Sequence, residues 1–377
     1  MIDSRNPPEG CRPAPRVSFF TLGCRLNQHD TAAMRSDLER EGWETAPARE
    51  AADVVIVNTC TVTRRADQES RQLIRRLVRE RPGARIVVTG CYAQRAPGEI
   101  QTLPGVSLVL GTSEREAIAS KISAPRAGAS VAPGRARRSI GLSAPLHFGR
   151  TRALLKIQDG CDSFCSYCIV PYVRGRSRSL PPAEALDRAR RLLDAGFQEL
   201  VLTGADLGAY GRDLGESALL PKLVESLLAL GARHRVRLSS IEPNKVDEAL
   251  VDAMAREPRF CRHLHLPLQS GSPAILRAMR RGYEPRDYAR LVERAAAGGP
   301  IGIGADVIVG FPGEGEAEFE ETMSFVSALP ISFLHVFRYS PRPGTAAVRL
   351  PASAAAVPDA VARERADRLR ALGEAKQ

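Results

Sequence analysis

The sequence predicts an α/β protein of two domains, a Rossmann-like domain with a parallel sheet followed by a partial (β/α)6 barrel. Short apolar runs rich in β-branched residues alternate with helical stretches on both sides of residues 121–150, and strands that alternate with helices form parallel sheets. Residues 121–150 are rich in Ala, Pro, Gly, Ser and Arg without a sustained period, which is typical of a linker. The 377 residues, 44% of them hydrophobic, are enough for two hydrophobic cores.

The N-terminal domain is predicted to span residues 16–121, after a disordered tail at 1–15. Its apolar runs predict strands at 17–23, 53–59, 85–90 and 107–112. Helical stretches lie between them, at about 30–41 and 66–80. This alternation predicts a parallel sheet with helices packed on it.

The C-terminal barrel is predicted to span residues 150–348, with a basic linker at 122–149 before it and a helical tail at 349–377 after it. Its predicted strands lie at 153–158, 199–204, 236–241, 263–269, 304–311 and 333–340. Its predicted helices lie at 182–195, 217–230, 245–256, 272–280, 286–297 and 316–328. Because a complete barrel has eight such units, six predict a partial one.

The charge balance indicates the class of partner. Lys and Arg number 54 against 43 Asp and Glu, which gives a net charge of +11 and favours a polyanion, with nucleic acid first and a membrane surface second. No apolar run approaches the ~18 residues of a membrane span, and the first sixteen residues hold Asp, Glu and four Pro in place of a hydrophobic signal segment. We therefore expect a cytosolic protein without a membrane anchor.

Eight cysteines lie at positions 11, 24, 60, 91, 161, 165, 168 and 261. In a reducing compartment they suit metal binding or burial better than disulfides. Cys24, Cys60 and Cys91 each follow a predicted strand, and the carboxyl ends of parallel strands meet at one edge of a sheet. We expect these three thiols to converge; the alternative is three separately buried apolar thiols. Cys11 and Cys261 lack partners at ligand spacing and are interpreted as a tail thiol and a core residue.

Cys161, Cys165 and Cys168 form a CxxxCxxC loop directly after the first barrel strand. Thiolates select zinc or iron–sulfur centres, but a closed zinc site needs four ligands and this loop offers three. The loop resembles that of the radical S-adenosylmethionine superfamily, in which the unligated iron of a 4Fe-4S cluster binds the methionine amine and carboxylate. The alternative is a zinc site completed by a distant Cys or His.

The resemblance implies further cofactor contacts at the strand ends of the barrel. Thr203 and Gly204 match the position that holds the methionine amino group, and Ser239, Ser240 and Glu242 match the ribose contacts. Gln269 ends the fourth strand, and Val309 and Gly310 belong to the segment that packs beside adenine. Without the cysteine loop, all of these could be ordinary polar residues and turn glycines of strand ends.

Together the two cysteine sets resemble the radical S-adenosylmethionine methylthiotransferase family, whose N-terminal domain binds a second 4Fe-4S cluster. The resemblance runs from about residue 16 to 373 and includes TLGCRLNQHD, VIVNTCTVTRRAD, VTGCYAQ, LKIQDGCDSFCSYCIVPYVRGRSRS, HLHLPLQSGS and DVIVGFPGE. Within the family, TLGC, NTCTVT and VTGCYAQ look like the MtaB type, which methylthiolates C2 of N6-threonylcarbamoyladenosine at tRNA position 37. The C2–H bond is not acidic, so the implied reaction uses a 5′-deoxyadenosyl radical, and the auxiliary cluster carries the sulfur.

The resemblance implies two 4Fe-4S clusters, bound by Cys24, Cys60 and Cys91 and by Cys161, Cys165 and Cys168, together with S-adenosylmethionine. It also implies tRNA as substrate, an electron donor such as flavodoxin or ferredoxin, a sulfur donor, and a monomeric enzyme. The family usually ends with an RNA-binding TRAM module, and this sequence stops about where that module would begin. We therefore expect RNA affinity to come from basic side chains of the two domains and the linker.

Two sets of arginines are candidate RNA contacts. Arg174, Arg176 and Arg178 lie close to the cluster loop and are expected to meet the substrate. The second set, Arg71, Arg75 and Arg79, is spaced four apart on one face of a predicted helix, although such charges are often only a solvated face. His263 and His265 alternate on a strand and can face the barrel interior, or be satisfied core histidines.

Two rival functions remain at this stage. A relative acting on isopentenyladenosine in tRNA or on a ribosomal-protein aspartate would keep all six ligand cysteines and differ in its substrate pocket. A non-enzymatic zinc protein that binds nucleic acid would need a fourth ligand in each site and has no need of a barrel.

Overall fold

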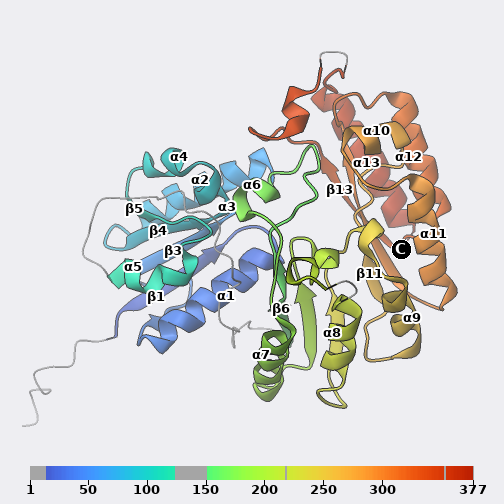
Figure 1. The fold of residues 1–377 in the computed structure, drawn as a ribbon. Coiled ribbons are helices and arrows are strands. Elements are labelled where there is room, and N and C mark those ends of the chain that lie inside the picture. Colours follow the sequence, from blue (N-terminus) through green and yellow to red (C-terminus); the bar gives the residue numbers. More distant parts are fainter. Residues whose placement is uncertain (1–13, 124–150, 217–218, 352–353, 377) are drawn as a thin grey trace, which may run out of the picture.

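A computed structural model of the chain describes residues 14–123, 151–216, 219–351 and 354–376 (Figure 1). The predicted tail at 1–15 and linker at 122–149 therefore lie almost wholly outside the described residues, as does Cys11. Two α/β units stand side by side, coloured blue to teal and green to red in Figure 1. The predicted α/β class with parallel sheets is confirmed.

The N-terminal sheet is parallel with the order β2-β1-β3-β4-β5. Its strands are β1 (Arg16–Thr21), β2 (Glu44–Thr45), β3 (Val54–Thr59), β4 (Arg85–Gly90) and β5 (Val106–Val109). Its helices are α1 (Arg25–Arg40), α2 (Arg64–Glu80), α3 (Cys91–Arg95), α4 (Pro97–Gln101) and α5 (Ile118–Ser123). Strand β3 is buried along its whole length because helices cover both faces of the sheet.

Six parallel strands of the second unit follow one another in chain order. They are β6 (Arg152–Lys156), β9 (Glu199–Thr203), β10 (Arg235–Leu238), β11 (His263–His265), β12 (Gly302–Val309) and β13 (Phe333–Arg338). They form two three-stranded sheets, and bridges from Val236 to Phe260 and from Ser240 to His265 join β10 to the segment that contains β11. This open arrangement is the expected partial barrel.

Helices cover the outer face of this barrel (Figure 1). They are α7 (Pro182–Asp194), α8 (Leu219–Leu228), α9 (Glu248–Arg256), α10 (Pro273–Ala278), α11 (Pro285–Ala297), α12 (Glu316–Ala328) and α13 (Asp359–Ala375). The short antiparallel pair β7 (Gln158–Asp159) and β8 (Arg178–Ser179) and helix α6 (Val170–Arg174) flank the cysteine loop. Single 3-10 turns lie at Arg115–Ala117, Leu207–Ala209, Arg212–Leu214, Pro243–Lys245 and Ala346–Arg349.

Alternation along the barrel strands separates an outer apolar face from an inner face. On β12, Ile303, Ala305 and Val307 belong to the core under the helices, so Gly304 and Asp306 face inward.

No helix among the described residues is long and apolar enough to cross a membrane.

Buried ion pairs connect the two units. Asp30 of α1 is paired with Lys156 at the end of β6 and with Arg174 of α6. On the other side of the interface, the fully buried Arg342 donates to Thr61 Oγ1 at 2.8 Å and pairs with Asp67. Buried, hydrogen-bonded charges tolerate little displacement, so these pairs fix the orientation of the two units.

Candidate metal centres

The three N-terminal cysteines converge at one edge of the first sheet. Thr59 pairs with Gly90 in the β3–β4 register, so Cys60 and Cys91 follow neighbouring residues. Gly23 lies so close to Cys60 that a Cβ added at Gly23 would be 2.8 Å from the Cys60 Cβ. The predicted convergence follows from this strand pairing.

Burial controls the protonation of these thiols. Burial, together with the nearby thiols of Cys91 and Cys24, raises the pKa of Cys60 to about 12. Burial also raises the pKa of Cys91, which Arg174 partly offsets. The two buried thiols are therefore protonated at neutral pH unless a cationic centre replaces the proton.

Two glycines place these cysteines. Gly23 and Gly90 have φ of 102° and 100°, a region that L side chains rarely adopt. A Cβ on Gly90 would lie 2.4 Å from the Thr59 carbonyl oxygen. The glycine before the cysteine in TLGC and VTGC is thus required by the turn that brings each thiol to the sheet edge.

Asn27, which the sequence analysis missed, ties this edge together. Its Nδ2 donates to the carbonyl oxygens of Leu22 at 2.8 Å and Thr59 at 3.1 Å, and its Oδ1 accepts from Arg174 at 2.7 Å. The sequence feature that could have pointed to Asn27 is its place in the first turn of α1, three residues after Cys24.

The barrel cysteines lie in the loop between β7 and α6. Burial, with help from the carboxylate of Asp206, raises the pKa of Cys161 to about 11, and burial with the neighbouring Cys165 raises that of Cys168 to about 12. Gly160 has φ of 75°, and a Cβ there would lie 2.0 Å from the Arg176 carbonyl oxygen. The loop therefore needs glycine at the position before its first cysteine.

The spread of the thiols distinguishes between types of centre. Ligand sulfurs 2.3 Å from one tetrahedral zinc lie about 3.8 Å apart. Among the described residues, neither cysteine triad brings its three Sγ atoms within 4.8 Å of one another. Within the described residues, neither triad therefore has the compact arrangement of a single-ion site.

A charged cavity of about 450 Å³ adjoins the barrel cysteines, and its lining includes Cys165, Asp206, Glu242, Lys245 and Arg281. Asp206 is buried, its Oδ2 pairs with Lys245, and its Oδ1 has no hydrogen-bond partner among the described residues. Arg281 Nη1 lies 3.4 Å from Cys165 Sγ and 3.1 Å from Glu242 Oε1. Charges of both signs beside an unpaired carboxylate oxygen suit a ligand that has both an amine and a carboxylate, such as the methionine part of S-adenosylmethionine.

Of the cofactor residues predicted at the ends of β9 and β10, Glu242 is the one that lines this cavity in the described part of the chain. Thr203 is buried, and a Cβ on Gly204 would lie 2.8 Å from Gln158 Oε1. Ser239 is buried and Ser240 exposed, while Glu242 lines the cavity itself. Asp206, Lys245 and Arg281 were not predicted, although Asp206 follows Gly204 by only two residues.

The remaining predicted cofactor residues, Gln269, Val309 and Gly310, lie in different surroundings. Gln269 has φ of 70°, rare for a non-glycine residue, and its buried Oε1 is unpaired among the described residues. Val309 packs into the outer core, so only its backbone could meet a cofactor on the inner face. Gly310, with φ of 74°, packs against Ala362 of α13.

The arginines after the cysteine loop separate into two environments. Arg174 is buried and bonded to Asn27, Asp30 and Asp159, which favours a structural role over the expected contact with substrate. Arg176 is exposed and Arg178 is partly exposed, so contact with substrate remains a prediction for these two.

Of the predicted α2 arginines, Arg75 and Arg79 are exposed, whereas Arg71 is half-buried and donates to the Tyr92 hydroxyl at 2.8 Å. Cys261 is buried, as expected for a core residue.

Asp30 is the centre of the charge network between the two cysteine sites. Burial alone would raise its pKa, but Arg115, Lys156 and Arg174 together hold that pKa well below its ordinary value. Ionised Asp30 therefore contributes its full share to the free energy of unfolding above the ordinary carboxyl pKa. This contribution is lost as the pH falls toward the pKa of Asp30 in the folded state.

We expect Asp30→Asn to lower the free energy of unfolding by about 3–5 kcal/mol, because it leaves buried cations without a counter-charge. Denaturant unfolding at neutral pH measures this loss. Asp37→Asn is the matched control, since Asp37 lies on the same helix and pairs with Arg40 near the surface, where a loss below about 1 kcal/mol is expected. Equal losses in the two variants would contradict the role given to the buried network.

Comparisons with known families give one match in each of the two α/β units. Residues 16–111 match a family described as "Uncharacterized protein family UPF0004", and residues 155–326 match the Radical SAM superfamily. The chain is 41% identical to the threonylcarbamoyladenosine tRNA methylthiotransferase MtaB of Bacillus subtilis, over 95% of this chain and 80% of the relative. It is 38% identical to the MtaB protein of Aquifex aeolicus, over 96% and 88%.

Other matches lie further away. A tRNA-2-methylthio-N(6)-dimethylallyladenosine synthase of Syntrophus aciditrophicus is 35% identical over 89% of this chain and 74% of the relative. Among solved structures, the radical S-adenosylmethionine methyltransferase TsrM of Kitasatospora setae, with tryptophan and an S-adenosylmethionine analogue bound, superposes with a TM-score of 0.65. That match covers 86% of this chain and 73% of TsrM at 17% identity, and it supports the fold alone.

Proposed function

Because the chain belongs to the radical S-adenosylmethionine tRNA methylthiotransferase family, we propose that it attaches a methylthio group to C2 of N6-threonylcarbamoyladenosine at position 37 of tRNA. The observation that supports this most strongly is the pair of cysteine triads, one at the carboxyl edge of the N-terminal sheet and one in the loop after β7. Cys91 packs against Ile169 and Val173, at the helix that directly follows the barrel cysteine loop. The two candidate centres are thus neighbours across the domain interface.

In this proposal Cys161, Cys165 and Cys168 hold the cluster that binds S-adenosylmethionine, and Cys24, Cys60 and Cys91 hold the second cluster. The bound groups would supply the one-electron chemistry that opens an unactivated C–H bond. The protein holds the two sites in fixed relation through the buried side chains of Asn27, Arg174 and Asp30. The electron and the replacement sulfur come from separate donors.

The inner surface of the barrel carries arginines where it faces α1. A cavity of about 730 Å³ lies between α1 and the inner face of the barrel, and four arginines help to line it: Arg25, Arg35, Arg152 and Arg237. The threonylcarbamoyl group has a carboxylate and a hydroxyl, whereas the isopentenyl group is a hydrocarbon. Arg35 already pairs with Glu39, and Arg152 and Arg237 pair with Glu199. The threonylcarbamoyl substrate is therefore supported by the MtaB relatives and not by this lining.

The test is to reconstitute the protein anaerobically with iron and sulfide and assay it on two tRNAs. One bears threonylcarbamoyladenosine and the other isopentenyladenosine at position 37. We expect the 2-methylthio nucleoside only from the first, measured in nucleoside hydrolysates by mass spectrometry. Product from the isopentenyl tRNA alone would overturn the substrate assignment, and absence of product from both would overturn the activity.

Binding of tRNA is expected to weaken steeply with salt, because each phosphate contact contributes about 0.7–0.9 to the slope of log K against log salt. Replacing Arg71, Arg75 and Arg79 with Ala should make the slope shallower by up to about 2–3, since three contacts at most are lost. Filter binding over a range of salt concentrations measures it.

The matched control removes three arginines of the same spacing from α11, by changing Arg286, Arg290 and Arg294 to Ala. Helix α11 belongs to the outer layer of the barrel and lies far from the N-terminal unit in Figure 1, so we expect the slope to stay the same. Equal changes of the salt slope in both triple variants would show that tRNA responds to the total charge of the protein. The arginines of α2 would then be solvent-exposed charges without a specific contact to tRNA.

A further inference from the structure

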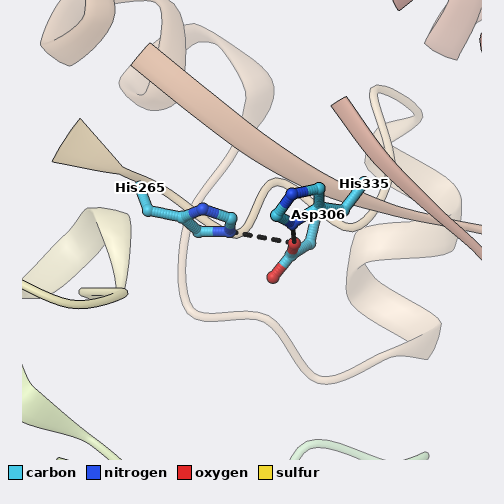
Figure 2. Close-up of side chains that lie close together, drawn as sticks. All are labelled: His265, Asp306 and His335. Carbon is cyan, nitrogen blue, oxygen red and sulfur yellow. Dashed lines mark hydrogen bonds and ion pairs between the residues drawn. The ribbon is translucent and has the colours of Figure 1, made fainter. Parts of the chain in front are cut away.

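A cluster without cysteine lies on the inner face of the barrel. His265, Asp306 and His335 come from the neighbouring strands β11, β12 and β13, and their side chains point toward one another (Figure 2). Asp306 pairs with His335 in the strand register, and His265 pairs with Gly304, two residues before Asp306 on the same face. The sheet itself therefore brings the three side chains together.

The distances match the coordination of one ion. Asp306 Oδ1 lies 2.9 Å from His265 Nε2 and 3.3 Å from His335 Nδ1, and all three ligand atoms lie within 4.8 Å of one another. Two ligands at about 2.0–2.1 Å from an ion, with an angle between 90° and 109°, lie about 2.9–3.4 Å apart. Within the described residues this is the one group of three or more such side chains that meets this spacing.

Phe333 supports the cluster from one side. Gly304 leaves space for the Phe333 ring, which lies 2.1 Å from where a Cβ at Gly304 would be. The ring centroid is 5.9 Å from that of His265 and 5.6 Å from that of His335. Aromatic packing thus limits the rotation of both imidazoles, while the His335 side chain remains 54% exposed and leaves the other side open.

We propose that His265, Asp306 and His335 bind one divalent first-row transition ion, with open coordination positions on the inner side of the barrel. Imidazole nitrogen and carboxylate oxygen suit Zn²⁺, Fe²⁺ and Co²⁺ better than Mg²⁺ or Ca²⁺, which prefer oxygen ligands. Three protein ligands leave room for water or an oxygen donor of a ligand, as in catalytic rather than structural sites. The site shares no residue with the two cysteine triads.

The competing explanation is a hydrogen-bonded triad in which both imidazoles donate to the carboxylate and no ion is needed. The two explanations differ in stoichiometry. An ion site takes up one equivalent of metal at neutral pH, and binds it more weakly when any of the three ligands is removed.

The experiment reconstitutes the protein anaerobically, removes iron that is not held in a cluster with a chelator, and then titrates Co²⁺, and separately Zn²⁺, into the full chain. Equilibrium dialysis counts the bound ions, and the Co²⁺ spectrum reports the ligands. We expect one additional ion per chain, with weak d–d bands and no thiolate charge-transfer band.

Asp306→Asn and His335→Ala should each weaken binding by about tenfold or more. His263→Ala is the matched control, because His263 stacks on the same Phe333 ring but is not part of the cluster. Circular dichroism and iron content verify that each variant is folded and loaded, and the exposed His335 is the variant expected to fold without difficulty. Failure to bind an additional ion, or equal affinity in the His335→Ala and control proteins, would overturn the proposal and leave the hydrogen-bonded triad.

Discussion

Replacing Cys161, Cys165 and Cys168 together with Ala is expected to abolish the reductive formation of 5′-deoxyadenosine from S-adenosylmethionine. The loop beside the charged cavity would lose all three thiol ligands of the proposed cluster. The measurement is anaerobic incubation with dithionite and S-adenosylmethionine, followed by chromatography of 5′-deoxyadenosine. Iron should fall from about eight to about four atoms per chain, because one of two 4Fe-4S centres is lost.

Cys261→Ala is the control for this triple variant, since it removes a buried thiol from the same domain but outside the loop. It should keep full cleavage and full iron content. If the triple variant still cleaves S-adenosylmethionine at the rate of the control, the barrel cysteines do not hold the reactive cluster.

Sequence patterns predict most of this fold because they are local. The run VVIVNT reads as a buried strand on its own, and β3 is buried along its whole length. Elements too short to show a period escape such an analysis, among them the two-residue strands β2, β7 and β8 and the five-residue helices α3, α4 and α6. The start of α1 was also placed too late, because its first turn, RLNQHD, is almost wholly polar.

In the candidate sites too, residues with a local pattern could be predicted from the sequence, whereas contacts between residues far apart in the chain could not. The cysteines are recognisable because each follows a strand or lies within a short spacing. Asp206 reaches Cys161 from 45 residues away, and Arg281 reaches Cys165 from 116 residues away, so neither contact can be inferred from spacing. His265 was noted on its strand, but its partners depend on the register of three strands, which only the fold determines.

Replacing Cys24, Cys60 and Cys91 with Ala is expected to separate the two halves of the reaction. These residues lie on the N-terminal domain, so the barrel should still bind S-adenosylmethionine and form 5′-deoxyadenosine. The methylthio product should disappear, because the site that supplies sulfur in the proposed function has lost its ligands, and about four irons per chain should remain.

Ser36→Ala is the matched control for the N-terminal triple variant, because Ser36 is a small buried residue of α1 whose Oγ has no hydrogen-bond partner among the described residues. Product analysis on tRNA bearing threonylcarbamoyladenosine should give full methylthiolation in this control. A folded triple variant that retains its barrel cluster and still forms the product would remove the N-terminal thiols from the reaction. Loss of both cleavage and product, with iron near zero, would instead show that the barrel cluster depends on the N-terminal triad, which the contact of Cys91 with Ile169 and Val173 makes physically possible.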